Sequence, residues 1–87
     1  MKIRDGFVLR QVADATIVVP AGDAAIDFNG MITLNETAAF LWSLLEKETD
    51  EEEMVRAMLE EYEVEEETAR AGIERFVEKL RAEGLLA

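Results

Sequence analysis

Residues 30–45 read GMITLNETAAFLWSLL, and the pattern of apolar residues changes inside this stretch. Before Asn35 the chain contains many β-branched residues and glycines, which are typical of strands and turns. After Asn35 the apolar residues recur with the period of an amphipathic helix, and asparagine is a favoured residue at a helix N-cap. The sequence therefore predicts an α+β fold, with strands before Asn35 and helices after it.

Three or four short antiparallel strands are expected in the first part of the chain. Residues 7–12 and 15–20 have strand composition, with Asp14 at the turn between them and a proline at the end of the second. Residues 25–28 and 31–34 flank the dipeptide Asn29-Gly30, and both of its residues tolerate the positive φ of a tight turn. The dipeptide predicts a hairpin at this position.

Three helices are expected in the second part. The first runs from about Glu36 to Glu46, and its apolar arc is wide enough to place this helix at the centre of the fold. Thr49-Asp50-Glu51-Glu52 has the pattern of a capping box that starts the second helix. The third helix begins near Glu65 and ends at Gly84, a natural residue just beyond a helix C-terminus.

The last two helices each carry one apolar stripe. The predicted stripes are Met54, Val55, Met58, Leu59 and Tyr62 on the second helix, and Ala69, Ile73, Phe76, Val77 and Leu80 on the third. Arg70 and Arg81 flank one edge of the third stripe, and Arg75 and Lys79 flank the other. These basic residues are expected mainly to pair with Glu74 and Glu78 at helical spacings.

Composition limits the size and setting of the molecule. With 87 residues and 49% hydrophobic residues, the chain is expected to form one domain over residues 1–87. It has no apolar run long enough to cross a bilayer, and its N-terminus lacks the features of a signal peptide. Because it also has no cysteine, a cytoplasmic location is the default expectation.

The missing residue types argue against catalysis. A chain without histidine or cysteine lacks the common nucleophile pairs, the usual acid–base group near neutral pH, and the imidazole and thiolate ligands of metal sites. The acidic runs at 50–53 and 65–67 lack the spacing of a calcium loop. We therefore expect no enzyme activity, no metal and no cofactor.

The charge distribution bears on partners. The net charge is −11, and residues 46–67 hold twelve acidic residues against Lys47 and Arg56. Such a segment repels phosphate backbones, so neither nucleic acid nor a membrane is an expected partner, and a basic or apolar protein surface fits better.

Residues 30–45 resemble the PqqD family, which comprises coenzyme pyrroloquinoline quinone synthesis protein D and its relatives. The most specific part is the junction Leu34-Asn35-x-Thr37-Ala38, followed by Leu41-Trp42-x-Leu44-Leu45. Further matches, which extend the resemblance over nearly the whole chain, are Val18-Val19-Pro20, Thr49, Tyr62, Leu80 and Gly84-Leu85-Leu86. Gly72 departs from the pattern, since many relatives have an acidic residue there.

The resemblance implies a winged-helix peptide-recognition domain. Such domains bind the leader of a ribosomally made precursor peptide as an added strand, and present it to a modifying enzyme, often a radical SAM enzyme. On this sequence, the strand at 31–34 would be the edge and the third helix the groove wall. The candidate peptide-binding residues are Met31, Ile32, Thr33, Leu34, Ala69, Arg70, Ile73, Phe76, Val77 and Arg81.

Each candidate also has a structural interpretation. The four basic residues of the third helix are expected mainly to pair with glutamates of the same helix, and the capture of acidic groups on a leader is the alternative. Ile73, Phe76 and Leu80 are expected mainly to fill the core, whereas Val77, beside the two outer arginines, is the expected contact residue. Trp42 is expected to pack in the core or at its rim, with an interface role as the alternative.

Two other classes of function fit the predicted order of elements. The first is an assembly subunit or homodimer that uses the same edge and groove for protein contact. The second is a DNA-binding winged helix, but that class needs basic residues on the recognition helix and wing. Here the second helix is acidic and the Asn29-Gly30 turn has no basic residue.

Overall fold

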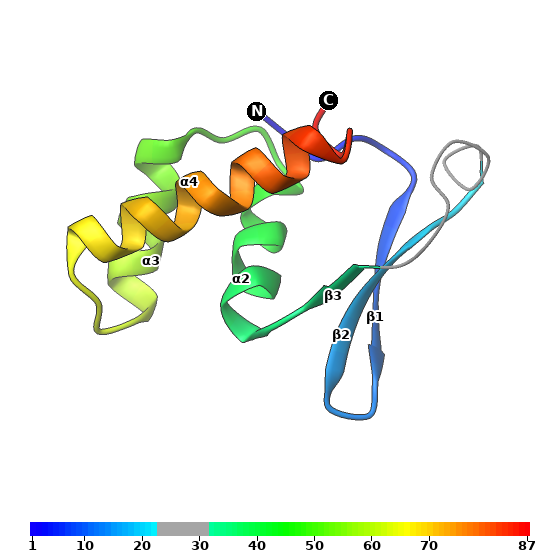
Figure 1. Cartoon of the computed structure of the whole chain (residues 1–87), viewed down its shortest axis with the longest axis horizontal. Coiled ribbons are helices and arrows are strands. Elements are labelled where there is room, and N and C mark those ends of the chain that lie inside the picture. The colour runs from blue at the N-terminus through cyan, green and yellow to red at the C-terminus, as the bar shows by residue number, and fades with distance from the viewer. Residues whose placement is uncertain (23–31) are drawn as a thin grey trace.

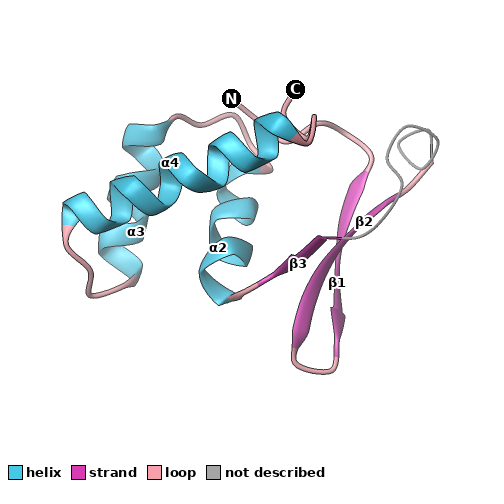
Figure 2. Ribbon diagram, viewed as in Figure 1, coloured by secondary structure: helices cyan, strands magenta, loops and turns pink. Residues whose placement is uncertain are grey.

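The computed structural model describes residues 1–22 and 32–87, and three strands precede three helices in it (Figures 1 and 2). This order confirms the α+β prediction. The described elements are β1 (Phe7–Val12), β2 (Ala15–Pro20), β3 (Ile32–Leu34), α2 (Glu36–Leu45), α3 (Glu51–Glu61) and α4 (Glu66–Ala82). The predicted strand at 25–28, the hairpin at Asn29-Gly30 and the residue Met31 lie outside the described residues.

The described strands form one antiparallel sheet in the order β1-β2-β3. At the tight turn between β1 and β2, Ala13 adopts a positive φ of 57°. One face of the sheet turns to the helices and buries Val18 of β2 completely. Val8 and Val12 of β1 remain 40% and 56% exposed, and they lie opposite Val19 and Ala15 of β2.

α2 stands at the centre of the fold, as its wide apolar arc predicts. The Asn35 side chain accepts a hydrogen bond from the backbone N–H of Ala38 at 2.8 Å, which confirms the predicted cap. Leu41, Trp42 and Leu45 are buried. Trp42 is 1% exposed and meets the ring of Phe7 edge-on at 6.5 Å, so it belongs to the core.

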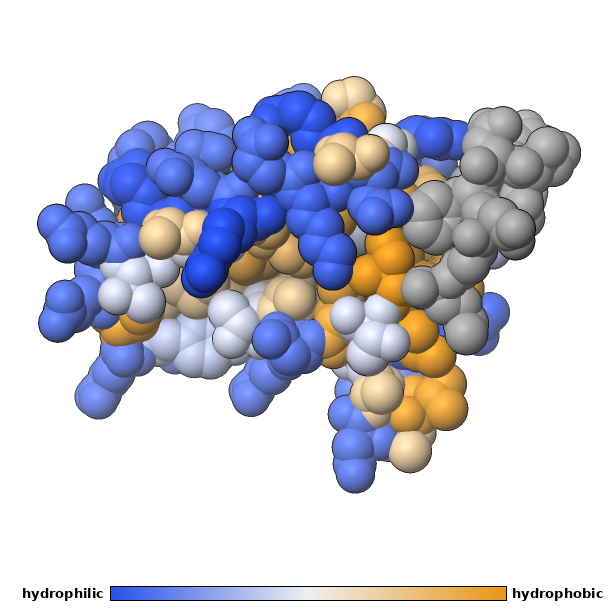
Figure 3. Space-filling model, viewed as in Figure 1, coloured by the Kyte–Doolittle hydropathy of each residue, from blue (hydrophilic) through white to orange (hydrophobic). Residues whose placement is uncertain are grey.

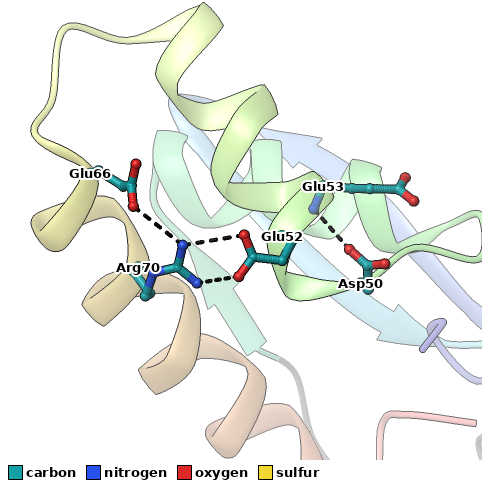
Figure 4. Close-up of polar contacts among 5 residues, drawn as sticks. All are labelled: Asp50, Glu52, Glu53, Glu66 and Arg70. Carbon is teal, nitrogen blue, oxygen red and sulfur yellow. Dashed lines mark hydrogen bonds and ion pairs between the residues drawn. The ribbon is translucent and has the colours of Figure 1, made fainter.

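The prediction of the α3 start was wrong by one residue. The N-cap is Asp50 rather than Thr49, because Asp50 has an extended backbone and its Oδ1 accepts from the backbone N–H of Glu53 at 2.8 Å (Figure 4). The backbone N–H of Thr49 instead donates to the carbonyl of Met1 at 3.0 Å. Leu59, assigned to the buried stripe, is 37% exposed.

α4 ends as predicted, with Gly84 at a φ of 74°. The chain then turns back so that Leu85 is fully buried and Leu86 forms a bridge with Ile3. The two ends of the chain therefore lie together on the helical side of the molecule (Figure 1). In the described part of the chain, no helix is long and apolar enough to cross a membrane.

Candidate functional site

The outer edge of β3 and the side of α4 form a narrow groove. β3 pairs with β2 on one side only, and no further strand pairs with it among the described residues. Between β3 and α4 lies a pocket of about 140 Å³. Its lining residues are Ile32, Thr33, Leu34, Asn35, Ala38, Phe76, Lys79, Leu80 and Glu83.

The three residues of β3 differ in exposure. Ile32 is half-buried, Thr33 is exposed, and Leu34 is buried at 6%. Leu34 anchors the strand in the core, and no described strand pairs with the other side of β3. Such an edge offers backbone donors and acceptors to an extended peptide.

The groove opens into a larger hollow beyond the end of β3. This hollow of about 570 Å³ lies between α2, α3 and α4, and Asn35, Ala38, Phe76 and Lys79 line both spaces. Its further lining residues are Thr37, Leu41, Met58, Tyr62, Val64, Thr68, Ala69, Gly72 and Arg75. In Figure 3, hydrophilic residues cover α4 and a more apolar band lies beside it, toward the sheet.

The buried residues of α4 correct one expectation about contacts. Ala69, Ile73, Val77 and Leu80 are all exposed by 3% or less. Val77, at 1%, is therefore a core residue and not the exposed contact residue that was expected. Phe76 is half-buried and lines both the groove and the hollow, so it offers the accessible ring.

Arg70, a predicted contact residue, is held by two carboxylates away from the groove. Its Nη1 and Nη2 donate to both carboxylate oxygens of Glu52, at 2.6 and 3.3 Å, and Nη2 also reaches Glu66 at 3.4 Å (Figure 4). The hydrogen bonds and charge of Arg70 lower the pKa of Glu52, and the same contacts raise the pKa of Arg70. Arg70 thus joins α4 to α3.

Arg81 also lies outside the groove lining, and its Nη1 donates to Glu78 at 3.3 Å. This bond is one of the helical-spacing pairs that the sequence predicts. The basic residues that line the spaces beside β3 are Arg75 and Lys79, on the other edge of the α4 stripe. Sequence periodicity finds both edges but does not tell which edge faces β3.

Tyr62 stands at the far wall of the hollow. Its ring meets that of Phe40 edge-on at 5.5 Å. Burial raises the pKa of its phenol, and the negative charges of Glu36 and Glu61 raise it further. The phenol is therefore a neutral hydrogen-bonding group at physiological pH.

The described residues of the site can hold a chain segment. They offer a strand edge, an apolar lining and two cationic side chains. Among residues 1–22 and 32–87, no three acidic side chains come close enough together to hold a metal ion.

Comparison with known proteins supports this description. In the solved structures, the chain is similar to the one described as "TbiB1 in Complex with the TbiA(beta) Leader Peptide". The TM-score is 0.77 at 28% identity, over 99% of this chain and 94% of that one. No curated protein sequence gives a match.

The family comparison covers most of the chain. Residues 11–86 match the family described as coenzyme PQQ synthesis protein D (PqqD). Together with the structural match, this supports the expectation that the chain is not an enzyme. Because the matched region holds the end of β1, all of β2 and β3, the junction at Asn35 and the helices α2, α3 and α4, the chain belongs to the PqqD family.

Proposed function

We propose that this chain is a non-catalytic peptide-binding chaperone. It binds the leader of a ribosomally made precursor peptide as an added strand on β3, with α4 as the opposite wall. The single observation that carries this proposal is the edge of β3 that faces the groove along α4 and has no partner strand in the described part of the chain. The similarity to TbiB1, a protein solved with a leader peptide, supports it.

Strand addition suits a recognition protein that must also release its ligand. Main-chain hydrogen bonds along β3 supply affinity that depends little on sequence, and pockets beside the strand supply selectivity. A flexible leader loses chain entropy on binding, which keeps the affinity moderate. β3 is only three residues long, so side-chain pockets must contribute much of the binding.

The bound peptide would be presented to a modifying enzyme, such as a radical SAM protein, in pyrroloquinoline quinone or related peptide biosynthesis. Holding the leader raises the local concentration of the core peptide at the active site of that enzyme. The single domain over residues 1–87 and the cytoplasmic location stay predictions from the sequence.

An NMR titration of the labelled protein with the leader segment of the precursor encoded beside it tests the proposal. We expect amide shifts at Ile32–Leu34 and on the groove side of α4. A folded protein with no shifts at high peptide concentration would contradict leader binding.

Proline substitutions at the strand edge locate the contact. Neighbouring residues of an edge strand direct their N–H groups alternately to the partner strand and outward. We therefore expect both Ile32→Pro and Thr33→Pro to abolish binding. The variant that loses an outward N–H removes a donor to the peptide, and the variant that loses the N–H directed at β2 weakens the pairing with that strand. Thr33→Ala keeps the N–H and is the matched control. Normal binding by both folded proline variants would place the peptide elsewhere.

A second candidate function, protein assembly, is favoured by the outer face of the sheet. Val8 and Val12 are exposed there, and the outer edge of β1 is unpaired among the described residues. A homodimer through this face would change the sedimentation coefficient with concentration, and Val12→Lys would restore the monomer. A monomer at all concentrations would exclude the homodimer.

A further inference from the structure

The hollow beside the groove differs in charge from the rest of the molecule. The chain has 20 acidic residues among 87, yet none of the described residues that line the hollow is acidic. Arg75 and Lys79 are the cations in the lining. The end of the hollow at Arg75 and Lys79 is therefore locally positive on a molecule of net charge −11, whereas the negative charges of Glu36 and Glu61 reach its far wall at Tyr62.

The two lining cations also differ from the others on α4. Arg70 and Arg81 are each bound to carboxylates of this chain. Arg75 and Lys79 are exposed and form no ion pair with any described residue. They are four positions apart, so they project from the same side of α4. Their charges are thus available to a ligand.

The remaining lining suits a side chain with an apolar body. Leu41 and Met58 lie at the floor as buried residues, and Val64 and Phe76 form half-buried walls. The wall at Gly72 has open space beside it, since a Cβ built at this residue meets no atom within 4 Å. The lining includes Thr37 in the first turn of α2, where the helix dipole favours negative charge.

The charges also differ along the two connected spaces. Glu83 and Lys79 both line the narrow groove, whereas Arg75 and Lys79 are the charged residues in the described lining of the hollow. A peptide that runs through both spaces meets a carboxylate at one end and unpaired cations at the other. This difference favours one direction and one register of the bound peptide.

We propose that the hollow is a selectivity pocket for a short acidic–apolar segment of the peptide bound on β3. An apolar side chain fills the space between α2 and α4, and a neighbouring aspartate or glutamate side chain binds Arg75 and Lys79. This inference rests on the proposed function, since it concerns the continuation of the same peptide beyond the end of β3.

Both the proposed function and this inference are tested by a selection of peptides on the immobilised full chain. The peptides come from a random linear library displayed on phage. We expect the enriched peptides to share an aspartate or glutamate next to a large apolar residue. We also expect them to lose binding to Thr33→Pro, which ties them to the strand edge. If no enriched peptide depends on the β3 edge, the proposed function and this inference both fail.

Paired charge variants then distinguish a failure of this inference from a failure of the proposed function. For an enriched peptide, Arg75→Gln with Lys79→Gln should raise the Kd about tenfold, the size expected for losing a hydrogen-bonded charge contact. Arg70→Gln with Arg81→Gln changes the net charge equally on the same helix and should leave the Kd nearly unchanged. Peptides that need the β3 edge but respond equally to both pairs would overturn the inference and leave the proposed function standing.

Filling the hollow gives an independent measurement. Gly72→Leu places a side chain into the open wall without removing a charge, and should weaken the same peptides by a similar factor. The variant should keep the melting temperature of the wild type or exceed it, because leucine favours a helix more than glycine does. A folded Gly72→Leu protein that binds with unchanged Kd would show that the hollow stays empty in the complex.

Discussion

Tyr62 shows how one residue reports on its surroundings, because it is the one tyrosine in the sequence. Burial and two nearby glutamates raise the pKa of its phenol above the ordinary value of 10.0. The phenolate absorbance of the folded protein should therefore titrate at higher pH than that of the protein in denaturant. Glu36→Gln should lower the folded midpoint, and an unchanged midpoint would mean that the charge of Glu36 does not contribute.

The same raised pKa predicts how stability depends on alkaline pH. The unfolded phenol loses its proton first, so the contribution of Tyr62 is fully present below pH 10.0 and is lost as pH rises through the folded pKa. Tyr62→Phe should remove this part of the alkaline decline in melting temperature. An identical decline in the variant would contradict the prediction.

Arg70 gives a second residue-scale prediction, at acid pH. Since the pKa of Glu52 is lowered in the folded protein, the contribution of this pair is present above the unfolded value of 4.5 and is lost as pH falls through the folded pKa. Arg70→Gln should therefore lower the melting temperature slightly at neutral pH and hardly at all in strong acid. Arg81→Gln, whose pair with Glu78 is more exposed, serves as the control and should have a smaller effect.

At the scale of elements, α3 tests the assignment of a helix cap. Asp50→Ala removes the side chain that accepts from Glu53 and should cost about 1 kcal/mol in the free energy of unfolding. Thr49→Ala should cost clearly less, because its side chain does not cap the helix. Urea denaturation of the two variants measures the difference. A larger loss for Thr49→Ala would restore the capping box read from the sequence.

Elements were largely predictable from the sequence because they follow local rules. The strands at Phe7–Val12 and Ala15–Pro20, the cap at Asn35 and the end of α4 at Gly84 all depend on patterns within a few residues. The choice between Thr49 and Asp50 was not local, because the backbone of Thr49 is bound to Met1 from the other end of the chain.

The rotation of α4 was the part of the site that the sequence could not provide. A periodic stripe places Phe76 and Val77 on neighbouring positions but does not say which one the sheet and α2 cover. In the folded chain, Val77 is buried and Phe76 lines the groove. The same rotation brings Arg75 and Lys79 to the hollow and directs Arg70 toward α3.

At the scale of the whole molecule, charge is divided between the groove and its surroundings. Glu52, in the acidic first turn of α3, binds Arg70, which the helical period places on another side of α4 than Arg75 and Lys79. Because exposed charges are screened by salt, binding of an acidic peptide should weaken as salt rises. Binding that strengthens with salt would indicate that repulsion from the acidic surface dominates.

The joined ends of the chain have a kinetic consequence. The N–H of Arg4 donates to the carbonyl of Leu85, and that of Ala87 to the carbonyl of Lys2, each at 2.8 Å. These bonds connect opposite ends of the sequence, so they close the largest loop in the molecule, and loop-closure entropy makes them form late in folding.

Ile3→Ala, in this closure, should lower stability by about 2–5 kcal/mol, the usual cost for a buried isoleucine. Stopped-flow measurements should show that most of this loss appears as faster unfolding, with a nearly unchanged refolding rate. A slower refolding rate would instead mean that the ends meet early. Because these backbone hydrogen bonds between the termini form late, they control the unfolding rate of the protein rather than its folding rate.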